Sequence, residues 1–192
     1  MRMRCVAALI VTCGLLLAGC VGQAPADPPP ESSAAAQRNS TDVMFLQMMV
    51  PHHAQGLAMV RLAVDHAHLP EVRMLAAAID ATQTAEVDRM SGWLTTWGAP
   101  ATADEHAHAD HGGLPGTTSE EIAGLAATEG IDFDTRFLNL MIGHQDDAIQ
   151  LARMELSGGV NPLARSLASQ IDQSRTAQLK LMLGYLEKAR AA

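Results

Sequence analysis

Cysteine is nearly absent from the sequence, which has three cysteines in 192 residues. Two of them, Cys5 and Cys13, lie in an apolar run at the N-terminus that is typical of a secretory signal. Once that run is removed, Cys20 is the one cysteine left, and a single cysteine forms no internal disulfide. A disulfide framework, a thiolate metal cluster and a cysteine nucleophile are therefore excluded for the mature chain.

Basic residues and catalytic motifs are also scarce. The chain has 13 Lys and Arg against 21 Asp and Glu, and loss of Arg2 and Arg4 with the signal leaves 11 against 21, a net charge of −10. We expect no nucleic acid partner for so acidic a protein. No H-E-x-x-H, G-x-S-x-G, phosphate-binding loop or G-x-G-x-x-G occurs, and the predicted helices lack the E-x-x-H of di-iron sites. These absences predict that the protein is not an enzyme.

The N-terminal residues predict export and lipid anchoring. MRMRCVAALIVTCGLLLAGC has two arginines, an apolar run too short to span a membrane, and a small-residue end. The ending LAGC resembles the lipobox of bacterial lipoproteins, which are cut before the cysteine and acylated on it. Residues 1–19 are thus predicted to be a lipoprotein signal peptide, with Cys20 as the lipidation site and the protein outside the cell membrane. The alternative is an ordinary signal peptide that ends in cysteine. Residues 20–40, rich in Pro, Ala and Ser, are predicted to form a flexible tether.

The remaining chain has helical periodicity, few aromatic residues and no alternation of period two, which predicts an all-α domain over residues 41–189. Pro70 and Pro162 suit the first turn of a helix, and Gly130 and Gly158 suit helix ends. The expected helices cover residues 42–66, 71–97, 119–128, 132–157 and 162–189.

An internal repeat relates the two halves of this domain. His52 aligns with His144 at an offset of 92 residues, and the same offset aligns Pro70 with Pro162 without a gap. The repeat predicts two equivalent helical hairpins, residues 42–97 and 132–189, joined by a His-rich connection, 98–131. One amphipathic hairpin cannot bury its apolar face alone, so we expect the two to form a four-helix bundle.

Two repeat-related histidines are the candidate metal ligands. On a helical wheel, His52 and His144 share the apolar faces of their helices, and His53 lies at the edge of its face, so we expect the first two to meet inside the bundle with His53 at the mouth. Imidazole and thioether groups without a thiolate suit copper, Cu(I) especially. Binding should weaken below pH of about 6.5, where an unperturbed imidazole takes up a proton. The methionines expected beside the histidines are Met48, Met49, Met59 and Met141.

Neighbouring residues allow two readings of the same helices. Pro51 and Gly143 each precede an inward histidine, and either they perturb the helix at a binding site or they pack on each other at a helix crossing. Glu86 falls on an interior face with Gln178 as its counterpart, and it needs a partner, for which His52 is the expected one. Both residues are possible supports of the metal ligands. Buried histidines in a metal-free, methionine-filled core remain the alternative.

A second cluster lies in the connection between the hairpins. The stretch DEHAHADH contains His106, His108 and His111 among three carboxylates. Such a segment would bind Cu(II), Zn(II) or Ni(II) weakly. A solvated polar loop is the alternative interpretation.

The segments FLQMMVPHHAQGLAMV and FLNLMIGHQDDAIQLARMEL resemble the two signature segments of the domain of unknown function 305 family. The resemblance covers about residues 42 to 186 and includes TTSEEIAGLAATEG. It implies a ferritin-like four-helix fold, a secreted or lipid-anchored bacterial protein and, as in some members, periplasmic copper binding linked to copper tolerance.

The resemblance also places the family's paired histidines at His52-His53 and at His144-Gln145, and the methionine after each pair at Met59 and Leu151. The second segment departs from the family pattern at Gln145 and at Leu151. These departures favour binding by the first hairpin, with His144 assisting.

Together these observations predict a cell-envelope lipoprotein that binds a copper ion for buffering, tolerance or delivery. The expected partners are the metal ion and, through the lipid on Cys20, the membrane. Two alternatives remain: a metal-free structural or partner-binding envelope module, and a metal-dependent oxidoreductase that uses the same histidines.

Overall fold

The computed structural model describes residues 37–103 and 116–191. Within them the chain is all-α, as expected, and the helices begin and end within two residues of the expected bounds. None of these helices is long and apolar enough to cross a membrane. The helices are α2 (Ser40–His66), α3 (Pro70–Thr96), α4 (Ser119–Ala126), α5 (Gly130–Gly158) and α6 (Pro162–Arg190).

The helices begin where the sequence supplies caps. Asn39 and Asp42 form a capping box at the start of α2, and Thr118 and Glu121 form another at the start of α4. In each box, a side chain accepts the N–H of the third helical residue, whose own side chain accepts the N–H of the capping residue. Prolines occupy the first turns of α3 and α6, where no backbone N–H is needed.

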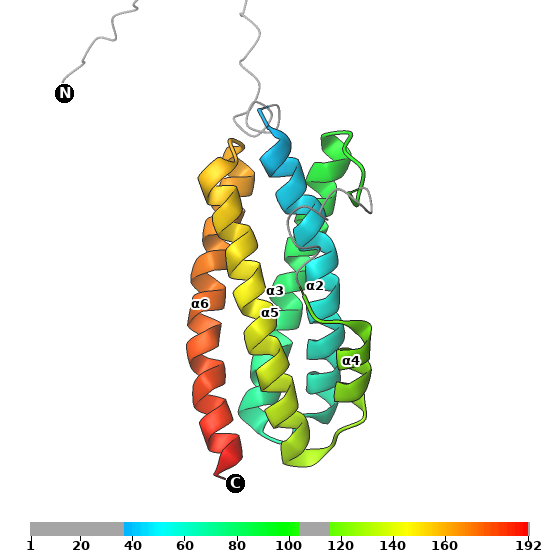
Figure 1. The fold of residues 1–192 in the computed structure, drawn as a ribbon, viewed down its shortest axis with the longest axis vertical. Helices are drawn as coiled ribbons and strands as arrows, with labels where there is room; N and C mark the ends of the chain where they lie inside the picture. Colours follow the sequence, from blue (N-terminus) through cyan, green and yellow to red (C-terminus); the bar gives the residue numbers. More distant parts are fainter. Residues whose placement is uncertain (1–36, 104–115, 192) are drawn as a thin grey trace, which may run out of the picture.

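The long helices form two hairpins that pack into one bundle (Figure 1). Helix α2 pairs with α3, α5 pairs with α6, and α2 packs against α5 between the hairpins, while the short α4 lies beside α2 and α5. Helices α3 and α6 approach each other much less closely. They are connected by the buried pair Glu86–Arg175 and by the exposed pair Glu71–Lys188. The domain is therefore a four-helix bundle made of two hairpins, with α4 added in the connection.

Two aspartates fasten each hairpin to the turn of the other. The buried carboxylate of Asp42, at the start of α2, accepts the backbone N–H groups of residues 160 and 161 at 3.0 and 2.8 Å. Its repeat counterpart Asp134, in α5, accepts those of residues 68 and 69 at 2.9 and 2.7 Å. Both sets of contacts are related by the offset of 92, so the hairpins hold each other reciprocally.

The apolar core is divided into two clusters by a layer of polar residues. One cluster draws on residues 45–49, 90–97, 148–152 and 164–171, and the other on residues 57–67, 72–79, 133–141 and 182–186 together with Leu125. Each of the four long helices therefore contributes to both clusters. Between them, each long helix carries polar residues, which we call the polar belt: His52, His53, Gln83, Glu86, His144, Gln145, Arg175 and Gln178.

The reciprocal aspartate contacts predict the cost of removing one of them. Asp134→Ala should lower the free energy of unfolding by about 2–3 kcal/mol, because it removes charge-assisted hydrogen bonds from two backbone N–H groups. Asp80→Ala is the control: it removes a partly exposed ion pair with Arg61 and should cost about 0–1 kcal/mol. Urea unfolding followed by circular dichroism measures both, and equal losses would contradict the role assigned to Asp134.

Candidate metal centre

The rings of His52 and His144 stack on each other at the interface between α2 and α5. Their centroids are 3.8 Å apart and their planes differ by 14°. Each residue is 2% exposed. The structure thus brings together the two repeat-related histidines as their shared helix faces predict. Their role as metal ligands stays a prediction.

Three of the four ring nitrogens of this pair have no hydrogen-bond partner among the described residues. These are Nδ1 and Nε2 of His52 and Nε2 of His144. The fourth, Nδ1 of His144, lies 3.3 Å from the hydroxyl of Thr117. Buried polar groups in proteins are nearly always paired, and leaving one unpaired costs about 1–3 kcal/mol. Such a concentration of unpaired nitrogens distinguishes this pair from ordinary core histidines.

Both imidazoles are neutral over the physiological pH range. Burial lowers the pKa of His52 to about 2, assisted by the nearby His144 and His53. Burial likewise lowers the pKa of His144 to about 3, with His53 and Arg175 adding to the effect. A neutral imidazole offers a nitrogen lone pair, which is the form that binds metal ions.

The stacked geometry limits how the two rings could bind one ion. Imidazole lone pairs lie in the ring plane, and two nearly parallel planes direct them side by side rather than toward a common point. An ion held by both rings therefore requires one of them to rotate. An ion held by one ring requires ligands from other residues.

Gly56 opens the space in which one of these nitrogens lies. A Cβ atom at this position would come within 2.7 Å of Nε2 of His144 and within 2.5 Å of Oε1 of Gln83. The amide of Gln83 is fully buried, and neither its oxygen nor its nitrogen has a partner among the described residues. Sequence reasoning missed Gln83, although it lies three residues before Glu86 and seven before Met90 on the same face of α3.

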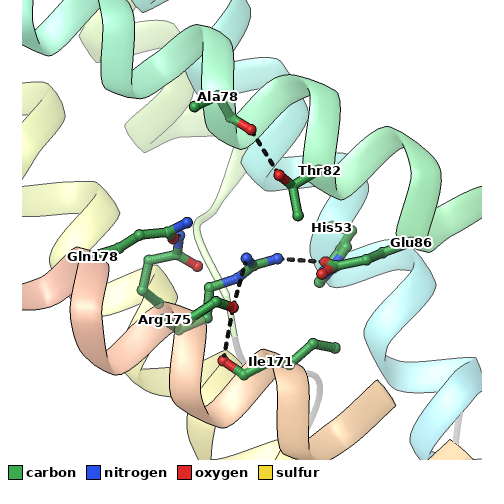
Figure 2. A network of polar contacts seen from close by, with 9 residues as sticks. His53, Ala78, Thr82, Glu86, Ile171, Arg175 and Gln178 are labelled. Carbon is green, nitrogen blue, oxygen red and sulfur yellow. Dashed lines mark hydrogen bonds and ion pairs between the residues drawn. The ribbon is translucent and has the colours of Figure 1, made fainter. Parts of the chain in front are cut away.

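Glu86 pairs with His53, so the expectation that its partner is His52 is wrong. Nε2 of His53 lies 2.7 Å from Oε2 of Glu86, and the same oxygen accepts a hydrogen bond from the guanidinium of Arg175. Figure 2 shows Arg175 reaching from α6 to Glu86 on α3, with His53 of α2 beside the carboxylate. His53 is fully buried, so its expected place at the edge or mouth of the site is wrong. Adjacent residues on a helix point about 100° apart, so His52 and His53 face different neighbours. Helix α3 lies on the side of α2 that carries His53.

This network carries a balanced pair of charges. Burial raises the pKa of Glu86, but the hydrogen bond from His53 and the charge of Arg175 together leave it below its usual value. Burial lowers the pKa of Arg175, while Glu86 opposes that effect. Burial also lowers the pKa of His53. A neutral His53 donates its Nε2 hydrogen to Glu86, and its Nδ1, which has no partner among the described residues, remains an acceptor.

The second hairpin replaces this network by an amide pair. Nε2 of Gln145 donates to Oε1 of Gln178 at 2.6 Å. These residues are the repeat counterparts of His53 and Glu86, so Gln178 supports Gln145 and the interaction is uncharged. Arg175 is the counterpart of Gln83, and sequence reasoning missed it because an arginine on an amphipathic helix is usually exposed.

The four candidate methionines flank the polar belt. Met48 and Met49 belong to one apolar cluster, and Met59 and Met141 belong to the other. All four are buried, each at most 4% exposed. The structure therefore places thioether groups in the core on both sides of the histidine layer.

The suggested contact between Pro51 and Gly143 is not a close helix crossing. A Cβ atom added to Gly143 would meet no described atom within 4 Å, and this glycine is exposed. Helix α2 continues through Pro51. A Cβ atom added to Gly56, in contrast, would meet side chains of α3 and α5.

A pocket of about 340 Å³ opens on the surface beside His144. Its lining includes Thr117, Glu121, Asp146 and Asp147. Burial raises the pKa of Asp147, and the neighbouring Asp146 adds to this effect. The pocket thus presents negative charge next to a buried imidazole.

Among the described residues, no third His, Cys, Asp or Glu ligand joins the stacked histidines. Within residues 37–103 and 116–191, no three His, Cys, Asp or Glu side chains are grouped so that they could hold a metal ion. The candidate secondary site at His106, His108 and His111 and the lipidation site at Cys20 lie outside the described residues.

Solved structures resemble this bundle over most of their length. A putative secreted protein of Streptomyces coelicolor superposes with a TM-score of 0.73 at 26% identity, over 78% of this chain and 94% of that one. A fragment from Deinococcus radiodurans gives a TM-score of 0.68 at 27% identity, over 78% and 97%. CopM in its Cu(I)-bound form gives 0.63 at 26% identity, over 78% and 98%.

No curated protein is significantly similar to the chain. The first two of these structures are described as DUF305 proteins. The model of that family matches residues 42–186, from the first turn of α2 to Leu186 in α6. The chain therefore belongs to the family described as domain of unknown function DUF305.

Proposed function

We propose that the protein binds copper at His52 and His144 and holds it without catalysis. The observation that carries the proposal is the buried pair of neutral imidazoles, three of whose ring nitrogens have no partner within residues 37–103 and 116–191. The similarity to CopM, a protein with solved Cu(I)-, Cu(II)- and Ag-bound forms, supports it.

The residues present suit a soft or borderline ion. Two neutral imidazoles and the buried methionines Met48, Met49, Met59 and Met141 supply nitrogen and sulfur, which favour copper over hard cations. The described residues group no set of carboxylates that would favour Ca²⁺ or Mg²⁺. The missing Cβ of Gly56 leaves space beside His144.

Buffering or delivery in the cell envelope is the role that fits best. The polar belt contains one carboxylate, Glu86, and it is held by Arg175 and His53 rather than being available for proton transfer. Export with a lipid anchor on Cys20 would place the domain outside the cytoplasmic membrane. A metal-free envelope module remains the alternative, and metal analysis of protein purified from copper-supplemented cells separates the two.

Removal of one stacked histidine tests the site directly. His52→Ala should weaken Cu(I) binding at least about tenfold, since it removes a ligand. Removing His106, His108 and His111 together should cost less Cu(I) affinity, because that segment offers only imidazole and carboxylate groups. His53→Gln, which keeps a donor toward Glu86, should also cost less than His52→Ala. Competition with a Cu(I) chelator measures all three, and unchanged affinity in His52→Ala would mean that the helical histidines are core residues.

The low pKa values predict that acid has little effect on binding. The sequence alone suggests weakening below pH of about 6.5, where an exposed ligand would lose about 25-fold in affinity between pH 7 and 5. Because the pKa values of His52 and His144 are about 2 and about 3 in the folded protein, Cu(I) affinity should change less than about threefold over this range. A decrease of tenfold or more would contradict the burial of the binding nitrogens.

The apo protein provides the control for this titration. As the pH falls through 6.5, the unfolded chain takes up protons on these histidines while the folded chain does not, so stability falls. Each histidine with a lowered pKa reduces the free energy of unfolding by about 2 kcal/mol between pH 7 and pH 5. Circular dichroism at both pH values verifies that the protein stays folded, and His52→Gln should reduce the pH dependence of the free energy of unfolding.

Lipid anchoring has its own test. Cys20→Ala should leave the protein unprocessed or release it from the membrane, because no thiol remains for acylation. Membrane fractionation and the mass of the mature protein measure this outcome. An unchanged mass and unchanged fractionation would rule out Cys20 as the lipidation site.

A further inference from the structure

Gln83 is a buried amide for which the described part of the chain provides no partner. It is fully buried in the polar belt, and both Oε1 and Nε2 lack a hydrogen-bond partner among the described residues. An amide in this position is costly, since its desolvation is not compensated. An apolar side chain of similar size would serve the core better, so the amide calls for a role beyond packing.

The amide lies at the same opening as the free nitrogen of His144. Oε1 of Gln83 and Nε2 of His144 are both within 2.7 Å of the point where a Cβ on Gly56 would lie. One comes from α3 and the other from α5, on either side of α2. Two unpaired polar groups from different helices therefore converge on a space that exists because residue 56 is glycine.

The second hairpin has no equivalent opening of this kind. The counterpart of Gln83 is Arg175, whose guanidinium is bonded to Glu86. The counterpart of Gly56 is Ala148, which has a Cβ. The free amide is thus confined to one side of the stacked histidines, and it breaks the two-fold symmetry of the site.

We propose that Oε1 of Gln83 is a third ligand of the copper site and sets its preference between the two oxidation states. This inference rests on the proposed function. An amide oxygen is a harder donor than imidazole or thioether, so it stabilises Cu(II) more than Cu(I). An ion held by the stacked imidazoles needs a further ligand, and Gln83 can supply it although it is not a His, Cys, Asp or Glu residue.

The test replaces the amide by an apolar side chain of similar size. In Gln83→Leu, affinity for Cu(II) should fall about tenfold while affinity for Cu(I) changes less than about threefold, and the Cu(II) electron paramagnetic resonance spectrum should change. The melting temperature of the apo protein should rise, because an unpaired buried amide is removed. A residue needed only for structure would lower the melting temperature instead.

Gln47→Leu is the matched control. It makes the same chemical change at a buried amide of α2 outside the polar belt but breaks the hydrogen bond to the carbonyl oxygen of Pro100, so it should lower apo stability and leave both copper affinities unchanged. Gln83→Met is a second variant in case the leucine does not fold: a thioether in place of the amide should tighten Cu(I) binding and weaken Cu(II) binding.

The outcomes separate this inference from the proposed function. If the wild type binds copper and both Gln83 variants keep its Cu(II) affinity and spectrum, the role of Gln83 is overturned and the histidine site stands. If the wild type binds neither Cu(I) nor Cu(II), both proposals fail. A selective loss of Cu(II) affinity in Gln83→Leu, absent in Gln47→Leu, supports the third ligand.

Discussion

The buried ion pair between Glu86 and Arg175 is the interaction on which the middle of the bundle depends. It joins α3 and α6, the neighbouring long helices that otherwise approach least, and its carboxylate also holds His53. A buried charge without its partner costs about 3–5 kcal/mol, so neither residue is tolerated alone. The stacked histidines lie buried beside this pair, and their burial, with the positive charge of Arg175 adding to it, keeps their pKa values low.

Much of the fold follows from periodicity, and part of the site does too. Helix bounds, the repeat and the meeting of His52 with His144 require only which residues face inward. The partner of Glu86 could not be obtained in this way, because His52 and His53 are both near the interior and the crossing of α3 decides between them. Arg175 and Gln83 could not be found from the sequence for a related reason. A helical wheel assigns polar residues to the exposed face of a helix. Their burial becomes clear only when the structure shows the partner of Arg175 and the lack of one for Gln83 among the described residues.

The two hairpins keep the same scaffold contacts but differ in the polar belt. The pairs Arg61–Asp80 and Arg153–Asp172 are equivalent at 3.0 and 3.1 Å, whereas His53–Glu86 corresponds to Gln145–Gln178. These partly exposed pairs are the same in both copies. The inner positions have diverged, so that Glu86 of the first hairpin carries the negative charge of the belt and Arg175 of the second carries the positive charge.

The reciprocal hydrogen bonds that Asp42 and Asp134 accept indicate how a fold of this kind could arise. Contacts in which each partner presents the same residues to the other define an isologous interface, the kind found in two-fold symmetric dimers. A fold of this kind is what the fusion of two copies of a dimeric hairpin would produce. In such a dimer both copies have the same sequence, so an arginine in one copy is always accompanied by the same arginine in the other. Joining the copies into one chain removes that restriction, and a single Arg175 opposite a single free Gln83 is an arrangement that only the fused form can have.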